Sequence, residues 1–203
     1  MKLNFNACDF LLSASQPRHF VSDQGREIAF VGRSNAGKSS TINCLTRQKR
    51  LARISKTPGR TQLINFFQFK HLEPLRLVDL PGYGFAKVDK RVKAQWHQLI
   101  DYYLRHRISL CGIILIMDAR HPLQPFDLQI LDWSLQSQYK LHILLNKADK
   151  LSRNQALASL NTVKKYLDKE YNTPVQVQLF SANKGTGLEV LEAGLTHWLL
   201  EPT

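Results

Sequence analysis

Apolar residues along this chain follow two alternating patterns. Short apolar runs lie at 28–31, at 112–117 and, interrupted only by His142, at 141–145, and such runs predict strands that are buried on both faces of a sheet. Between these runs, apolar residues recur every three or four positions, which predicts amphipathic helices. The predicted strands are 28–31, 62–69, 75–80, 112–117, 141–145 and 175–180. The predicted helices are 39–47, 89–107, 126–135, 152–167 and 188–199.

This alternation of strands and helices predicts an α/β fold in which helices cover both faces of a mostly parallel sheet. We expect a six-stranded sheet with one antiparallel strand, because 62–69 and 75–80 are joined by a short connection. Residues 1–25 carry few signals, and we expect them to form an N-terminal arm packed on the domain. Residues 26–203 then form a single domain, without internal repeats or linkers.

The composition is that of an ordinary globular protein, with 43% hydrophobic and 22% charged residues. No apolar run approaches the ~20 residues that a membrane helix needs. The N-terminal residues include Asn and Asp where a signal peptide is apolar, so we expect no export. The three cysteines are far apart and form no C-x-x-C motif, which suits a reducing compartment. We therefore expect a cytoplasmic protein.

The net charge of +12, with a pI near 9.8, predicts a polyanionic partner, a nucleic acid rather than a membrane. The alternative is a basic surface that serves solubility alone. The most basic stretch is 47–60, with six Lys or Arg among fourteen residues, and more basic residues follow the strand at 75–80. The residues concerned are Arg47, Lys49, Arg50, Arg53, Lys56, Arg60, Lys87, Lys90, Arg91 and Lys93.

A glycine-rich turn follows the first predicted strand. It has the pattern Gly32-x-x-x-x-Gly37-Lys38-Ser39, and a predicted helix begins directly after it, which is the context of a phosphate-binding P-loop. The backbone N–H groups of such a loop and the positive end of the helix dipole attract phosphate. Lys38 would contact the β- and γ-phosphates, and the Ser39 hydroxyl would hold Mg²⁺.

A second loop, Asp79-Leu-Pro-Gly82, begins where the strand at 75–80 ends. Because the carboxyl ends of parallel strands meet at one edge of a sheet, we expect it to lie beside the P-loop. Asp79 could hold Mg²⁺ through a water. The N–H of Gly82 could approach the γ-phosphate, which would make this loop a sensor of the third phosphate.

Two more loops at the same edge would recognise the base. Asn146-Lys-x-Asp149 follows a buried strand, and the Asp149 carboxylate can accept hydrogen bonds from N1–H and the 2-amino group of guanine, which adenine does not offer. The stem of Lys147 can lie across the base plane. In the loop after the last strand, the Ala182 amide can donate to guanine O6.

Together these loops resemble those of P-loop GTPases of the TrmE-Era-EngA-EngB-septin branch. Within it, the chain closely resembles the EngB family (also called YihA or YsxC) of bacterial ribosome-biogenesis GTP-binding proteins. The matching stretches are Gly32-Arg-Ser-Asn-Ala-Gly-Lys-Ser-Ser-Thr-Ile-Asn43, Thr57-Pro-Gly-Arg-Thr-Gln62, Asp79-Leu-Pro-Gly-Tyr-Gly-Phe-Ala-Lys87, Asn146-Lys-Ala-Asp149 and Ser181-Ala-x-Lys-x-x-Gly187. The similarity covers essentially residues 25–200 and implies a Ras-like GTPase domain.

The resemblance also implies roles for individual residues. The turn-rich, mobile segment around 57–61 would be switch I, and 79–93 would be switch II. Thr61 matches the threonine that contacts Mg²⁺ and the γ-phosphate, although Thr57 is a rival by residue type. The expected catalytic residues are Lys38, Thr61 and Gly82, and the expected Mg²⁺ ligands are Ser39, Thr61 and, through a water, Asp79. The expected nucleotide-binding residues are Gly32, Arg33, Ser34, Asn35, Ala36, Gly37, Lys38, Ser39, Ser40, Gly59, Arg60, Thr61, Asp79, Leu80, Pro81, Gly82, Asn146, Lys147, Ala148, Asp149, Phe180, Ser181, Ala182 and Asn183.

Two positions bear on how hydrolysis proceeds. Tyr83 stands where a Ras-like enzyme has the glutamine that orients the attacking water, so we expect slow intrinsic hydrolysis, of the order of 10⁻³ s⁻¹ or less. Asn35 stands where relatives in this branch help to bind K⁺ beside the phosphates. Such a cation could replace an arginine finger, so we expect hydrolysis that is stimulated by K⁺. The alternative is that Asn35 only satisfies the loop backbone.

The resemblance implies a slowly hydrolysing GTP switch in ribosome assembly, acting on the large subunit, and a requirement in normal cell division and septation. The expected partners are GTP or GDP and a ribosomal subunit or its precursor, with its rRNA and proteins. The expected cofactors are Mg²⁺ and K⁺, and we expect a monomer that binds no membrane. Movement of the switches would reposition nearby basic residues and couple nucleotide state to RNA binding. Two alternatives stay open: a GTP/GDP-binding scaffold with negligible hydrolysis, and a GTPase in another RNA-related process.

Overall fold

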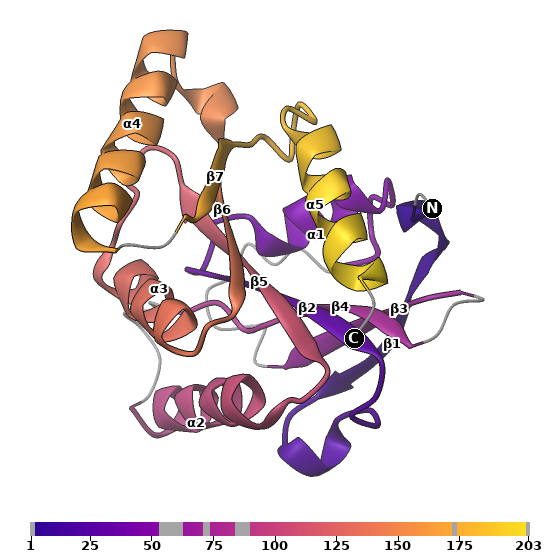
Figure 1. Cartoon of the computed structure of the whole chain (residues 1–203). Helices are drawn as coiled ribbons and strands as arrows, with labels where there is room; N and C mark the ends of the chain where they lie inside the picture. The colour runs from indigo at the N-terminus through magenta and orange to yellow at the C-terminus, as the bar shows by residue number, and fades with distance from the viewer. Residues whose placement is uncertain (1–2, 53–62, 71–73, 84–89, 172–173, 202–203) are drawn as a thin grey trace.

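The computed structural model describes residues 3–52, 63–70, 74–83, 90–171 and 174–201, and gives the backbone alone for 90–97. Within these residues a seven-stranded sheet has the order β1-β3-β4-β2-β5-β6-β7 (Figure 1). The strands are β1 (Cys8–Ala14), β2 (Arg26–Gly32), β3 (Ile64–Phe69), β4 (Leu75–Asp79), β5 (Leu110–Asp118), β6 (Lys140–Asn146) and β7 (Gln176–Leu179). The helices are α1 (Lys38–Leu45), α2 (Lys90–His106), α3 (Pro125–Gln136), α4 (Arg153–Glu170) and α5 (Leu188–Leu200).

The predicted α/β class is confirmed, and the strand count is corrected from six to seven. The extra strand, β1, pairs antiparallel with β3, which is itself antiparallel to β4, while β4, β2, β5, β6 and β7 pair in parallel. The sequence hides β1 because only its two ends are buried, and Phe10 and Leu11 are 51% and 42% exposed. An edge strand of this kind has no strict alternation of apolar residues. The division between an arm and a domain at residue 25 stays a prediction.

Helices cover both faces of the sheet, as the alternation of elements predicts (Figure 1). One hydrophobic cluster joins the sheet to α2, α3 and α4 through residues such as Tyr103, Leu131 and Val163. The other joins it to α1 and α5 through residues such as Ile42 and Leu195. The central strands are therefore buried from both sides, which explains their largely apolar sequences. Among the described residues, no helix combines the length and apolar character needed to cross a bilayer.

The parallel register brings four loops to one edge of the sheet. Phe30 of β2 pairs with Asp79 at the end of β4, and Asp118 at the end of β5 pairs with Asn146 at the end of β6. Leu145 of β6 pairs in turn with Leu179, the last residue of β7. The segments that follow β2, β4, β6 and β7 therefore start side by side, which is the place where ligands bind in sheets of this type.

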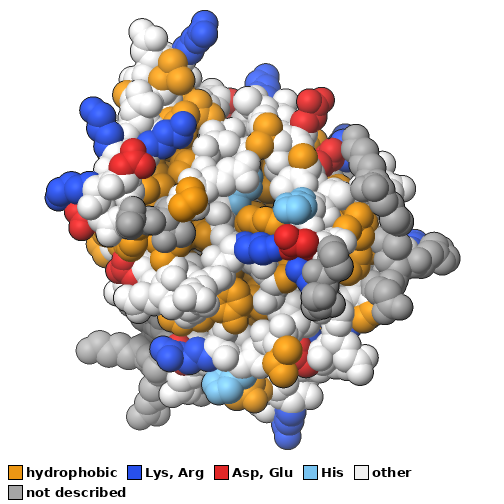
Figure 2. Space-filling view, viewed as in Figure 1, with side chains coloured by type: hydrophobic (Ala, Val, Ile, Leu, Met, Phe, Trp, Pro, Cys, Tyr) orange, Lys and Arg blue, Asp and Glu red, His pale blue; other side chains and the backbone are white. Residues whose placement is uncertain are grey.

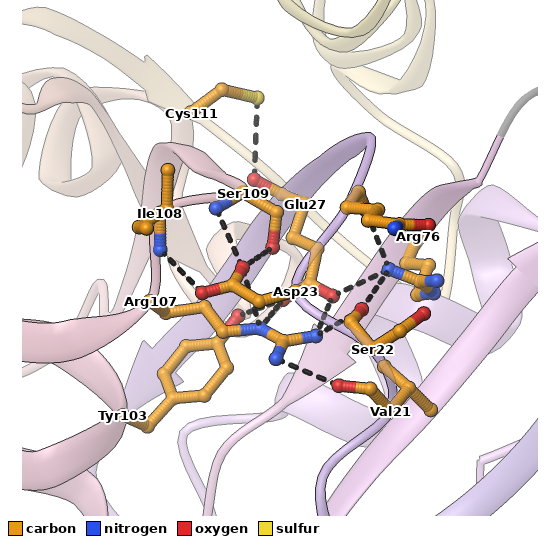
Figure 3. A network of polar contacts seen from close by, with 11 residues as sticks. Val21, Ser22, Asp23, Glu27, Arg76, Tyr103, Arg107, Ile108, Ser109 and Cys111 are labelled. Atoms are coloured by element: carbon orange, nitrogen blue, oxygen red, sulfur yellow. Dashed lines mark hydrogen bonds and ion pairs between the residues drawn. The ribbon is translucent and has the colours of Figure 1, made fainter.

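A buried polar cluster holds the opposite end of the sheet together (Figure 3). Glu27 of β2 is fully buried, and its carboxylate accepts hydrogen bonds from Arg107 Nε and Nη2 at 2.8 and 2.6 Å. It also accepts from Arg76 Nη1 of β4 and from the phenol of Tyr103 on α2, each at 2.9 Å. Arg107 donates further to the carbonyl of Val21. One carboxylate therefore joins β2, β4, the end of α2 and the connection before β2.

We expect Glu27→Gln to destabilise the protein by about 3–5 kcal/mol, because it leaves two buried guanidinium groups without their shared counter-charge. Urea unfolding followed by circular dichroism measures this change. Glu170→Gln, on the half-exposed partner of Lys169, is the matched control and should cost less than about 0.5 kcal/mol. A loss below about 1 kcal/mol for Glu27→Gln would show that the cluster contributes little.

Candidate functional site

The predicted P-loop connects β2 to α1. Gly37, the residue before α1, has φ 105°, and a Cβ there would lie 2.2 Å from Asn146 Nδ2, so only glycine fits without displacement. Lys38 is the first helical residue, and its side chain, 8% exposed, turns back over the loop. Its Nζ donates to the carbonyls of Gly32 and Arg33 at 3.0 and 3.3 Å. The ammonium group therefore lies inside the curve of the P-loop.

Asn35 lies at the exposed tip of this loop in the left-handed conformation, with φ 62°. Asparagine adopts this conformation more readily than most residues. Its side chain makes no hydrogen bond to any described residue, and the alternative that it serves only the loop backbone stays open. The predicted K⁺ contact is not tested by this geometry and stays a prediction.

Asp79 and Ser39 face each other across the site. The Ser39 hydroxyl donates to Asp79 Oδ2 at 2.9 Å, and Asp79 is 1% exposed. The other carboxylate oxygen, Oδ1, is buried and has no hydrogen-bond partner among the described residues. Burial raises the pKa of Asp79, whereas the nearby Lys38 and the Ser39 hydroxyl lower it, and burial in turn lowers the pKa of Lys38.

This pair of oxygen donors fits Mg²⁺. Magnesium prefers hard oxygen ligands and keeps several positions for water and substrate phosphates, so one carboxylate and one hydroxyl suffice from the protein. The partnerless Oδ1 of Asp79 is a buried acceptor that a metal-bound water could satisfy. The described residues contain no cluster of three or more His, Cys, Asp or Glu that could hold a metal by itself.

Gly82 lies directly against the P-loop. A Cβ at this position would approach Lys38 Nζ to 2.8 Å and Ser34 Cα to 2.9 Å, so a side chain would displace the loop. The next residue, Tyr83, is buried, and its phenol donates to Asp127 Oδ1 on α3 at 3.0 Å. The ring that stands in the place of a catalytic glutamine is therefore held by α3.

Asn146 connects the phosphate and base loops. Its Nδ2 donates to the carbonyl of Ala36 in the P-loop at 2.8 Å, and its Oδ1 accepts from the N–H of Ala182 at 3.2 Å. The side chain is 2% exposed. Sequence reasoning assigned Asn146 to the base-reading motif, and it missed this linking role because both partners come from other loops.

Lys147 and Asp118 form an ion pair that sequence reasoning missed. Lys147 is left-handed, with φ 64°, and its Nζ lies 2.9 Å from Asp118 Oδ2 at the end of β5. Asp118 also accepts from Arg120 Nε and Nη2 at 2.9 and 2.7 Å. Burial opposes the shift, but these hydrogen bonds lower the pKa of Asp118 well below its usual range. One feature of the sequence could have pointed to Asp118: it is a carboxylate at the end of a buried strand, at the edge of the sheet where ligands bind.

Asp149 is oriented by the loop after β7. Its Oδ1 accepts from the Ser181 hydroxyl at 2.6 Å, and that hydroxyl accepts in turn from the N–H of Lys184 at 3.1 Å. The hydrogen bond from Ser181 lowers the pKa of Asp149, so this carboxylate is ionised at neutral pH. An ionised carboxylate in a fixed orientation is suited to accept two hydrogen bonds from guanine.

The other predicted site residues differ in what they can offer. Four of them have buried side chains that pack inside the protein and support the loops: Ala36, Leu80, Pro81 and Phe180. Partly exposed residues at the predicted site are Arg33, Ser34, Ser40, Ala148 and Ala182, and Asn183 is exposed. Gly59, Arg60 and Thr61, with Thr57, lie outside the described residues. The nucleotide contacts of all these residues stay predictions.

The basic stretch begins on a well-anchored loop. Asn43 on α1 donates to the carbonyl of Ala52 at 2.8 Å and accepts from its N–H at 2.7 Å, which fixes the loop carrying the exposed Lys49 and Arg50. Arg47 pairs with Glu192 of α5 at 2.6 Å.

The other basic residues of the prediction are not described in full. Arg53, Lys56 and Lys87 lie outside the described residues, and α2 shows only its backbone at Lys90, Arg91 and Lys93. In the view of Figure 2, the Lys and Arg side chains of the described residues are scattered and form no continuous patch.

Known proteins match this chain along most of its length. Residues 27–147 match a family model described as "50S ribosome-binding GTPase". A "Probable GTP-binding protein EngB" from Azoarcus sp. (strain BH72) is 50% identical over 196 residues, which is 97% of this chain and 93% of the relative. One of the same name from Coxiella burnetii (strain RSA 331 / Henzerling II) is 47% identical over 194 residues, covering 96% and 93%.

Solved structures share the fold at lower identity. The crystal structure of a probable GTP-binding protein engB matches with a TM-score of 0.67 and 22% identity, covering 87% of this chain and 100% of that one. Era in complex with MgGDPNP and nucleotides 1506–1542 of 16S ribosomal RNA matches with a TM-score of 0.69 and 22% identity, covering 89% and 58%. The expected P-loop GTPase fold is thereby confirmed. The family match spans more than half of the residues, and the relatives are about half identical over nearly their whole length, so the chain belongs to the EngB family of GTP-binding proteins and is a GTPase.

Proposed function

We propose that this GTPase is a Mg²⁺-dependent, slowly hydrolysing switch that acts as a monomer in the cytoplasm in assembly of the large ribosomal subunit, and through it in cell division and septation. One observation carries the nucleotide part of the proposal: the Asn146 amide joins the P-loop to the loop after β7, so phosphate and base would be bound by one connected unit. The matching family description supports the large-subunit part.

In this proposal each loop contributes a defined group. Lys38 turns from the Gly32 and Arg33 carbonyls to the β- and γ-phosphates. Ser39 and, through a water, Asp79 would hold Mg²⁺, which when bound neutralises charge on the phosphate oxygens. The Gly82 N–H and Thr61 would contact the γ-phosphate. Lys147, held by Asp118, lies across the base, and Asp149 accepts from its Watson–Crick edge.

We expect Asp149→Asn to weaken GTP binding by about 100-fold or more and to improve binding of xanthosine triphosphate, because a carboxamide can donate to the 2-oxo group of xanthine. The Asn oxygen can still accept from the Ser181 hydroxyl, so the loop keeps its geometry. Competition with a fluorescent GDP measures both affinities. Asp168→Asn on the exposed face of α4 is the control and should leave them unchanged. Unaltered base preference in Asp149→Asn would disprove the assignment.

We expect hydrolysis to be at least about tenfold faster in K⁺ than in Na⁺, because a cation beside the phosphates would stabilise charge in the transition state. Asn35→Gly should abolish this difference, since glycine keeps the left-handed turn while removing the amide oxygen. Phosphate release at equal ionic strength is the measurement. Equal wild-type rates in the two salts would rule out the K⁺ site and leave the GTPase assignment intact.

We expect the protein to sediment with the large ribosomal subunit when loaded with a non-hydrolysable GTP analogue, less so with GDP, and less at higher salt, because contacts to RNA phosphates release counterions. A Lys49→Ala/Arg50→Ala variant should bind more weakly. Lys164→Ala/Lys165→Ala, another exposed pair of basic residues, on α4, is the control. Equal binding in both nucleotide states would mean that the net charge of +12 provides unspecific affinity.

A further inference from the structure

We propose that Tyr83 and Asp127 form an anchor that positions Gly82 for the γ-phosphate, so that Tyr83 acts as a positioning residue in discriminating GTP from GDP. This inference rests on the proposed function, in which the Gly82 N–H contacts the γ-phosphate. It concerns two residues that sequence reasoning left without a binding role. From the sequence alone, Tyr83 is only the residue at the position of the Ras-like glutamine, and Asp127 is only one residue of the predicted helix 126–135.

The first support is the buried hydrogen bond between the two side chains. Tyr83 is 6% exposed and Asp127 is fully buried, and the phenol donates to Asp127 Oδ1 at 3.0 Å. The second oxygen of Asp127 accepts from the N–H of Gln124 at 3.1 Å, at the start of α3. The carboxylate is therefore fixed by its own helix and holds the phenol in turn. The Tyr83 ring also packs against Phe126, with ring centroids 5.7 Å apart.

The electrostatic surroundings favour this pairing. Burial raises the pKa of Asp127 and of Tyr83, and Arg33 of the P-loop opposes both shifts. The hydrogen bonds from Gln124 and Tyr83 favour the ionised form of Asp127. Because a buried carboxylate needs its donors, the loss of the phenol hydroxyl would remove one of the two donors among the described residues that compensate Asp127 for lost water.

The second support is that the backbone of Tyr83 is fixed as well. Its carbonyl accepts from the N–H of Ser34 at 2.8 Å, and residues 33 and 83 form an isolated parallel bridge. On the other side of Gly82, the N–H of Leu80 donates to the carbonyl of Phe30 at 3.1 Å. Gly82 thus lies in a short segment that is held at both ends and pressed against Ser34 and Lys38.

It follows that the anchor determines where the Gly82 N–H points. If the phenol is released, Tyr83 loses its side-chain restraint and the backbone of the adjacent Gly82 gains freedom, so a contact of the Gly82 N–H that depends on a fixed direction weakens. GDP has no γ-phosphate and does not use this contact. The anchor should therefore affect the binding of GTP and its hydrolysis, and leave the binding of GDP almost unchanged.

The test is Tyr83→Phe, which keeps the ring and removes the hydroxyl. We expect the affinity for a non-hydrolysable GTP analogue and the single-turnover hydrolysis rate each to fall about five- to tenfold, with GDP affinity changed less than about twofold. Tyr171→Phe is a matched control, because it removes a phenol that donates to Asp132, a second carboxylate on α3. This control should change neither nucleotide affinity.

The possible results separate the inference from the function on which it rests. Equal losses for GDP and the GTP analogue in Tyr83→Phe, or no loss at all, would overturn the anchor while the wild-type protein still bound and hydrolysed GTP. Failure of the wild-type protein to distinguish the GTP analogue from GDP would overturn the proposed switch itself. Thermal unfolding with GDP bound would show whether Tyr83→Phe is folded when these values are measured.

Discussion

The arrangement of the site depends on one buried carboxamide. Asn146 ends β6, and the register between β5 and β6 places it beside the P-loop. Its two hydrogen bonds use one donor and one acceptor, and each partner is a backbone group of a different loop. Leaving such a group unsatisfied inside a protein costs about 1–3 kcal/mol, so the loops are held in a common geometry by a side chain that neither of them supplies. Gly37 is required for the same reason, since a side chain there would occupy the place of the Asn146 amide.

Strand β2 has a buried polar cluster at each end, and the two clusters differ in whether their carboxylate oxygens are all hydrogen-bonded. At its start, Glu27 compensates two buried arginines, and both oxygens of its carboxylate accept hydrogen bonds within the protein. At its end, Lys38 and Asp79 are buried together, with one carboxylate oxygen left without a partner among the described residues. The first centre is a structural one, since every oxygen of its carboxylate is used. The second retains an unused acceptor, which is the chemical signature of a place where a ligand completes the set.

The sequence predicts the scaffold and the chemical groups better than the connections between them. Apolar runs, interrupted in β6 only by His142, identify β5 and β6 because both faces of these strands are covered. Spacing within single loops identifies Lys38, Ser39 and Asp149, because those residues act where the chain itself turns. Asp118 and Asp127 were not found, since their importance lies in contacts with Lys147 and Tyr83, which are distant along the chain. Strand β1 was missed for a different reason: a half-exposed edge strand has a weak apolar pattern.

That edge strand has a consequence for the behaviour of the protein in concentrated solution. Without β1, the outer strand would be β3, whose sequence Ile64-Asn-Phe-Phe-Gln-Phe69 is rich in aromatic residues and carries no charge. Open strands of this composition pair readily with copies of themselves and promote aggregation. β1 covers that edge and is a poorer template in its own right, because its register shifts between Phe10 and Leu12 and Asp9 forms an ion pair with Lys70. The N-terminal segment thus protects the molecule against self-association, and truncations or fusions that disturb residues 8–14 would expose the aromatic edge of β3 to other copies of the chain.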